Sequence, residues 1–131
     1  MKPLNPGGSL FHAVGGGPCE EKTVISLAHD QQNLQVSFQC ENNPFINDNG
    51  YRSCNDPLYQ QEVFEVFVAR GVEVPRCYLE VEVNPNGALF VAGIGNPDGT
   101  GSHNQAKLIG CGESGIHWKV QANAQKGLWM G

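Results

Sequence analysis

The sequence predicts an all-β protein with the architecture of an antiparallel β-sandwich. Several runs alternate apolar and polar residues with a period of two, the pattern of a strand that buries one face. The 131 residues include 17 Gly and 8 Pro, which indicates frequent turns between short strands. No amphipathic helix of useful length interrupts this pattern. The chain is long enough to bury one core of ordinary size.

The first part of the chain predicts a terminal segment and then a hairpin. Residues 1–18 are rich in Gly and Pro, so we expect a flexible N-terminal segment before a single domain over residues 19–131. Residues 23–29 and 34–40 predict two strands joined by a turn at Asp30–Asn33. In the second strand, apolar residues alternate with Gln and Ser. These apolar residues are Leu34, Val36, Phe38 and Cys40.

A long polar loop over residues 41–57 leads to three further strands, at about 62–69, 77–84 and 88–94. A loop of this length in a compact domain is often functional. The Asn84-Pro-Asn-Gly87 turn predicts that the last two strands form a hairpin. Another polar loop, 95–104, and two weaker strands, at 106–111 and 117–122, complete this part of the sequence.

The two faces of the strand at 77–84 differ in chemistry. Cys77, Leu79, Val81 and Val83 point one way, and Tyr78, Glu80, Glu82 and Asn84 point the other. A sheet needs only one apolar face to pack. We therefore expect the opposite face to be free to carry polar groups that could bind a polar ligand.

Composition and charge exclude several classes of partner. The net charge is −5 and the eight Lys and Arg are scattered, so no basic stripe exists to bind nucleic acid or an anionic membrane. No apolar stretch approaches the ~20 residues needed to span a bilayer. We expect neither a nucleic-acid partner nor a membrane.

Five cysteines are many for this length: Cys19, Cys40, Cys54, Cys77 and Cys111. No CxxC pair occurs, which argues against structural zinc. The odd count leaves at least one thiol free or intermolecular if the others form disulfides. Disulfides favour an extracellular or cell-surface location, although the N-terminal residues contain no apolar core of a signal peptide. A cytosolic location is the alternative.

A family resemblance lies between Asn55 and Gly87. The run N-D-P-L-Y-x-x-E-V-x-E-V-F-V, a Pro-containing loop and Y-x-E-x-E-V-N-P-N-G resemble the family 9 carbohydrate-binding modules and their DOMON-like relatives. The resemblance covers roughly residues 23–129. It implies a sandwich of immunoglobulin-like or jelly-roll-like type that binds sugars and is not an enzyme. It also implies that the closing strands are missing after residues 124–131. Two explanations are open: the chain is a fragment, or a protein partner supplies the missing strands.

The resemblance supplies a candidate carbohydrate site. Tyr59 would cover the C–H face of a sugar ring, and carboxylates and amides would hydrogen-bond its hydroxyls. The polar candidates are Glu65, Tyr78, Glu80 and Asn84. Glu65 joins the other three only if its strand pairs directly with theirs. The alternative is an ordinary solvated face, with Tyr59 covering the sheet edge.

Other residues suggest further roles. Asp48 and Asp56, in polar loops, are candidate calcium ligands, and Trp118 is expected in the core. Glu65 and Glu80 could form a glycosidase pair, but a domain this small argues against hydrolysis. Two other classes remain open: a structural or assembly protein completed by a partner strand, and a haem domain with Met130 and His103 or His117 as axial ligands.

Overall fold

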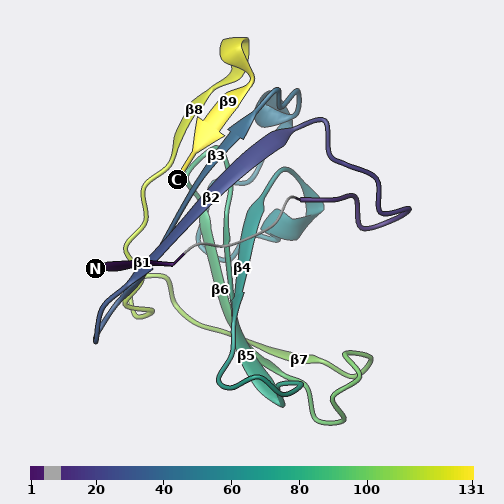
Figure 1. Ribbon diagram of the computed structural model, residues 1–131, viewed down its shortest axis with the longest axis vertical. Coiled ribbons are helices and arrows are strands. Elements are labelled where there is room, and N and C mark those ends of the chain that lie inside the picture. The colour runs from purple at the N-terminus through teal and green to yellow at the C-terminus, as the bar shows by residue number, and fades with distance from the viewer. Residues whose placement is uncertain (5–9) are drawn as a thin grey trace. The chain divides into compact units, whose positions relative to one another are not determined.

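A computed structural model describes residues 1–4 and 10–131 and shows a chain that is nearly all β (Figure 1). It contains one five-stranded and one four-stranded antiparallel sheet, and its helical residues within the described ranges form three short 3₁₀ turns. The predicted all-β class is confirmed, and two antiparallel sheets are consistent with a sandwich. The chain divides into two compact units. Unit 1 comprises Met1–Asn47 and Lys119–Gly131, and unit 2 comprises Asp48–Trp118.

Unit 1 contains the five-stranded sheet, in the order β1-β2-β3-β9-β8. The predicted hairpin is present: β2 (Lys22–His29) pairs with β3 (Leu34–Glu41). The carboxylate of Asp30 closes its turn by accepting hydrogen bonds from the backbone N–H groups of Gln32 and Asn33. These hydrogen bonds lower the pKa of Asp30, since they favour the ionised carboxylate.

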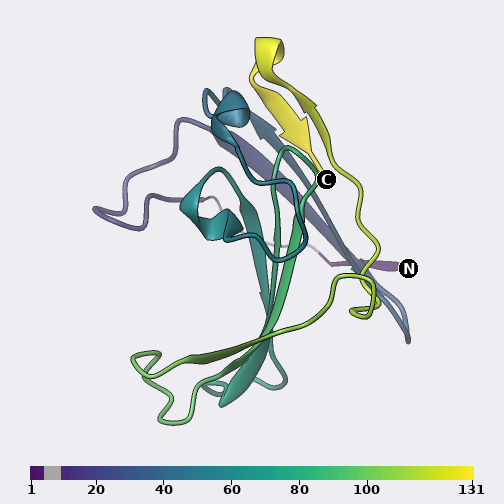
Figure 2. The same cartoon turned by 180° about the vertical axis from the view of Figure 1, so that it is seen from behind.

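The C-terminal residues form a strand of their own. After β8 (Gln121–Asn123), the short turn η3 (Ala124–Lys126) ends at Gly127, whose φ of 58° reverses the chain. Then β9 (Leu128–Met130) pairs with both β8 and β3, as the yellow hairpin in Figure 2 shows. Trp129 of β9 is 1% exposed, and its ring lies 4.7 Å from that of Phe38. Residues 128–130, expected only to approach a strand, thus form a paired strand themselves.

The N-terminal residues also contribute to this sheet. Strand β1 (Lys2–Leu4) pairs with β2, from Lys2 opposite His29 to Leu4 opposite Leu27. Three residues of the segment expected to be flexible are thus paired in a sheet. Residues 5–9 of the same segment lie outside the described residues.

Unit 2 contains the four-stranded sheet, in the order β4-β5-β6-β7. Its strands are β4 (Phe64–Val68), β5 (Cys77–Val83), β6 (Leu89–Gly95) and β7 (Gln105–Leu108). The predicted β5–β6 hairpin is confirmed: its turn has Gly87 at a φ of 80°, where glycine meets no steric penalty. The short turn η2 (Leu58–Gln60) packs against β5. The turn η1 (Ile46–Asp48) lies in the long polar loop.

A disulfide joins two distant segments of unit 2. Cys54, in the long polar loop, is bonded to Cys111, which follows β7. Beside it, the side chain of Asn55 donates to the carbonyl of Ile109 and accepts from the backbone N–H of Val91. These bonds hold the loop against the β6 and β7 end of the sheet.

The second half of the chain departs from the predicted pattern in two places. The weaker strands shorten to β7 and β8, and residues 109–120 form no strand. Trp118, expected in the core, is 44% exposed. Its indole N–H donates to the carbonyl of Gly87 at 3.0 Å. The backbone at Trp118 is not part of a strand, so the alternation that would have turned its ring inward does not exist.

Candidate functional site

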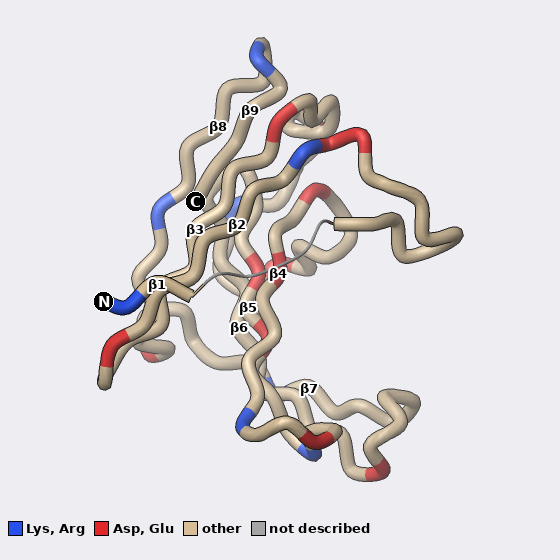
Figure 3. The backbone as a smooth tube through the Cα atoms, in the orientation of Figure 1, with Lys and Arg blue, Asp and Glu red and all other residues tan. Residues whose placement is uncertain are grey.

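One face of the unit 2 sheet gathers three carboxylates, and we call it the acidic face. Strand β4 pairs directly with β5, which places Glu65 opposite Glu82 and Phe67 opposite Glu80. Residues directly opposite on paired strands share a face, as do alternate residues of one strand. Glu65, Glu80 and Glu82 therefore lie together, and Figure 3 shows in red the acidic residues of β4 and β5.

Aromatic side chains flank the carboxylates. The ring of Tyr59, on η2, stands edge-on to Phe90 with 6.2 Å between the ring centroids. Phe90 lies opposite Glu82 in the register of β5 and β6. On β4, the ring of Phe67 stands edge-on to Tyr78 at 5.9 Å. Tyr59 is 57% exposed and Phe67 is 56% exposed, so both rings offer apolar surface to a ligand.

The acidic face also carries the core of unit 2, which differs from the sequence-based expectation. Phe90, Ala92 and Ile94 of β6 share this face and pack with Leu58 and Ala88. The expectation was that the apolar face of β5 would pack and the polar face would remain free. Instead, η2 covers part of the polar face, and only the remainder is open around Glu65, Phe67 and Glu80.

Glu82 is the most unusual residue of the site. Its side chain is fully buried (0% exposed), and neither carboxylate oxygen makes a hydrogen bond of ordinary geometry. The pKa of Glu82 is raised to about 8, first by burial and then by the neighbouring carboxyls of Glu80 and Glu65, while the backbone amide of Tyr59 acts in the opposite direction. A buried carboxyl beside other carboxyls favours its neutral form. The neutral form of Glu82 is therefore favoured at neutral pH.

Glu65 is half-buried and responds in the same direction. Desolvation raises the pKa of Glu65, and the negative charge of Glu80 adds to this shift. Glu65 and Glu80 keep some contact with solvent. A ligand can therefore reach these two carboxyls, whereas Glu82 lies behind them.

The structure places the other sequence-predicted residues as follows. Tyr78 lies on the acidic face, and its hydroxyl accepts a hydrogen bond from the Asn104 amide. Asn84 is fully buried: its amide donates to the carbonyl of Tyr51, and its oxygen accepts from the backbone N–H of Ala88. Asn84 holds the turn between β5 and β6 and offers no surface to a ligand.

The two predicted calcium ligands, Asp48 and Asp56, lie in different turns of the polar loop. Both amides that follow Tyr51, those of Arg52 and Ser53, donate to the carboxylate of Asp56, so Asp56 closes a local turn. Asp48 lies at the end of η1 with an exposed side chain. Among residues 1–4 and 10–131, no three His, Cys, Asp or Glu side chains form a group that could hold a metal ion.

Two residues of the site were missed by the sequence interpretation. Phe67 was assigned no role, and Glu82 was placed on the polar face but not among the candidate ligands. A signal for both was available, because Phe67 has the same strand parity as Glu65, and Glu82 the same parity as Glu80. Their importance depends on the β4–β5 register and on the cover provided by η2, which no local pattern specifies.

Comparison with known proteins gives one similar curated sequence. A protein of Arthroderma benhamiae named "Extracellular protein" is 30% identical over 76 residues, which cover 58% of this chain and 34% of that protein. The chain thus spans about a third of the length of the curated relative that it matches. No protein-family model matches the chain, and no solved structure matches it.

Within the part of the chain that the structure describes, no helix has the length and apolar character to cross a bilayer.

Proposed function

We propose that unit 2 is a non-catalytic carbohydrate-binding module whose ligand lies on the open part of the acidic face. The observation that carries this proposal is that Glu65 and Glu80 share a sheet face with the exposed ring of Phe67, and that the exposed ring of Tyr59 packs against Phe90 of the same face. The two carboxyls and the two exposed rings come from η2, β4 and β5.

The chemistry of this arrangement suits a sugar. A pyranose ring has an apolar face of C–H groups and a rim of hydroxyls. Exposed aromatic rings cover the C–H face at little cost in conformational entropy. Carboxylates accept strong hydrogen bonds from the hydroxyls. Glu65 and Glu80 can accept hydrogen bonds from such hydroxyls, so the ligand would supply the donors.

The buried Glu82 contributes to the same site through its charge state. Because Glu82 is neutral at neutral pH, the cluster carries less negative charge than three ionised carboxylates would. This removes the repulsion that an ionised Glu82 would exert on Glu65 and on Glu80. We propose that Glu82 keeps the two accessible carboxyls at the spacing that the ligand needs.

We also propose that the protein acts outside the cell. The similar protein of Arthroderma benhamiae is named as extracellular, and unit 2 contains a disulfide. Disulfides persist in oxidising compartments. A binding module there would hold an attached protein close to a polysaccharide.

The test is a glycan-array screen followed by calorimetric titration of the sugars that bind. Tyr59→Ala removes a ring that is mostly exposed, so we expect the fold to persist and the affinity to fall by about tenfold. Glu65→Gln keeps the shape but weakens the acceptor, and we expect a smaller loss of affinity. Phe11→Ala, at an exposed ring of unit 1, is the matched control and should bind as the parent chain does.

Three results would contradict the proposal. A blank array from a folded sample would exclude the sugar ligand. Equal binding by the parent chain and Tyr59→Ala would move the ligand away from the acidic face. Release of new reducing ends from a bound oligosaccharide would show that the protein is catalytic.

A further inference from the structure

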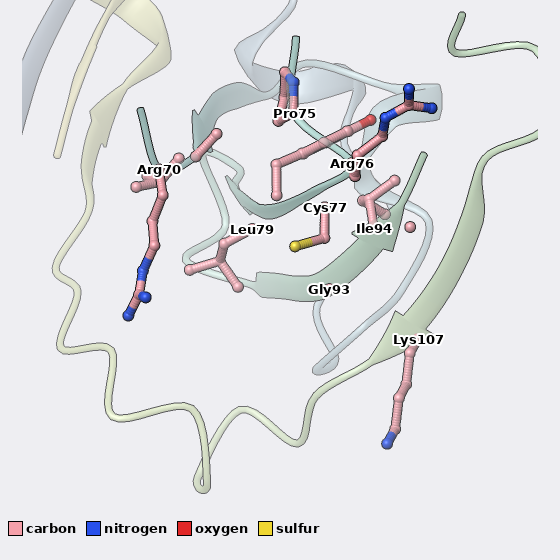
Figure 4. A pocket seen from close by; sticks show the side chains of 12 residues that line it. Arg70, Pro75, Arg76, Cys77, Leu79, Gly93, Ile94 and Lys107 are labelled. Atoms are coloured by element: carbon pink, nitrogen blue, oxygen red, sulfur yellow. The ribbon is translucent and has the colours of Figure 1, made fainter. Parts of the chain in front are cut away.

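The other face of the same sheet contains a second candidate site, which we call the cationic hollow. It has a volume of about 670 Å³ and lies where β4, β5 and β6 meet the loop over residues 69–76 (Figure 4). Cys77 and Leu79 of β5, which point away from the acidic face, lie at its centre. Every residue that lines it belongs to unit 2.

The hollow exists because β6 carries glycine on this face. Gly93 lies opposite Leu79, and Gly95 lies opposite Cys77. A Cβ atom placed on Gly93 would meet no other atom within 4 Å. The two glycines therefore leave open space over Leu79 and Cys77, which larger side chains at these positions would have filled.

Positive charge surrounds the open space. Unit 2 contains four Lys or Arg residues, and three of them, Arg70, Arg76 and Lys107, line the hollow. In Figure 4 these three side chains start at the rim of the space around Cys77 and Leu79 and extend outward from it. Such clustering is unexpected in a chain whose net charge is −5, and it makes this part of the surface attractive to anions.

Two of these cations lack an acidic partner. The described residues contain one ion pair, between Asp98 and His103, so neither Arg70 nor Lys107 is paired, and Glu73 of the adjoining loop pairs with neither. Arg76 is held in place, because its guanidinium donates to the carbonyl of Pro97 at 2.6 Å. The hollow thus combines one fixed guanidinium with two cations that are free to meet a ligand.

We propose that the cationic hollow binds the carboxylate of a hexuronic acid, with the sugar ring lying over Cys77 and Leu79. Arg and Lys are the usual partners of a carboxylate, and a guanidinium can hold it through two parallel hydrogen bonds. The apolar centre suits the C–H face of the ring and would be of no use to an inorganic anion. That the carboxylate belongs to a sugar rests on the proposed function, whereas the anionic character of the ligand does not.

Cys77 provides a direct reporter of occupancy. Its thiol is free and exposed at the centre of the hollow, while Cys40 is buried and Cys19 is half-buried. In a Cys19→Ser background, the rate of reaction with a neutral maleimide should therefore report Cys77. A ligand in the hollow would block this reaction.

The probes are trigalacturonate, neutral galactotriose and benzoate, a free organic acid. We expect trigalacturonate to slow the labelling of Cys77 by about tenfold at about ten times its Kd, less so at high salt, and the two other probes to have little effect. The Arg70→Gln/Lys107→Gln variant should lose this protection. Arg52→Gln/Lys126→Gln makes the same change in net charge at exposed positions elsewhere and should keep it.

The outcomes separate this inference from the proposed function. If trigalacturonate gives no protection while neutral sugars bind in a manner that depends on Tyr59, the cationic hollow is overturned and the acidic face stands. If protection depends on Arg70 and Lys107 but persists in Tyr59→Ala, the hollow is supported whatever the acidic face binds. Protection by benzoate equal to that by trigalacturonate would overturn the assignment to a sugar.

Discussion

The two faces of the unit 2 sheet share the same strands but have opposite chemistry. On the acidic face, β5 presents Glu80 and Glu82, and η2 covers part of them. On the other face, β5 presents Cys77 and Leu79, and the cations lie around a space that glycines leave open. The strand period of two is what allows a single strand to serve both faces.

The two faces differ in whether their charged side chains can reach water. Glu82 lies near the end of β5 and is fully buried, so it cannot reach water and its pKa rises. Arg70 and Lys107 are long, lie at the periphery of the sheet and remain exposed. A ligand on the acidic face, as proposed, would therefore bind with a dependence on protonation, whereas the charges around the cationic hollow are already exposed to solvent.

The largest expected effect comes from removing the framework that both faces share. Cys54 and Cys111 are 57 residues apart in sequence, and closing a loop of that length restricts the unfolded chain. We expect Cys54→Ala/Cys111→Ala to lower the free energy of unfolding by about 4 kcal/mol, measured by urea denaturation. Cys77→Ser, at an exposed free thiol, should change it little. An equally small change in both variants would show that the disulfide does not stabilise unit 2.

A smaller loss of stability is expected from a change in the turn between β5 and β6. Asn84→Ala removes the acceptor for the backbone N–H of Ala88, which is buried. The carbonyl of Tyr51 keeps a donor in Asn86. Leaving one buried donor unpaired should lower the free energy of unfolding by about 2 kcal/mol. Asn104→Ala, at an exposed amide, is the control. An unchanged stability with lost sugar binding would instead place Asn84 in the ligand site.

The smallest change in the free energy of unfolding, counted per pH unit, is a pH dependence that arises from the acidic face. The pKa of Glu82 is raised from 4.5 to about 8 in the folded state. Between these values the folded protein binds more protons than the unfolded chain, so the free energy of unfolding falls as the pH rises, by at most about 1.4 kcal/mol per unit. Glu82→Gln should flatten this slope in urea titrations at several pH values.

The control for that measurement is Glu113→Gln, at an exposed carboxylate of unit 2, which should leave the slope as it is in the parent chain. A slope in Glu82→Gln as steep as in the parent chain would show that Glu82 is not the group responsible.

The local features of this protein follow from the sequence alone. The alternation in residues 34–40 and 77–84 specified strands and their two faces, and the Asn84–Gly87 turn specified the hairpin between β5 and β6. It also brought Tyr78, Glu80 and Glu82 to one face. These features depend on neighbouring residues and on the strand period, so a single sequence can specify them.

The pairings between distant segments are visible only in the tertiary structure. It placed β9 beside β3, chose Cys54 and Cys111 among five cysteines, and set Glu65 opposite Glu82. It also covered Glu82 and left Trp118 exposed, against the expectation for each. The physical reason is that burial and register depend on which segments meet across long stretches of chain, and the period of a strand carries no information about its partner.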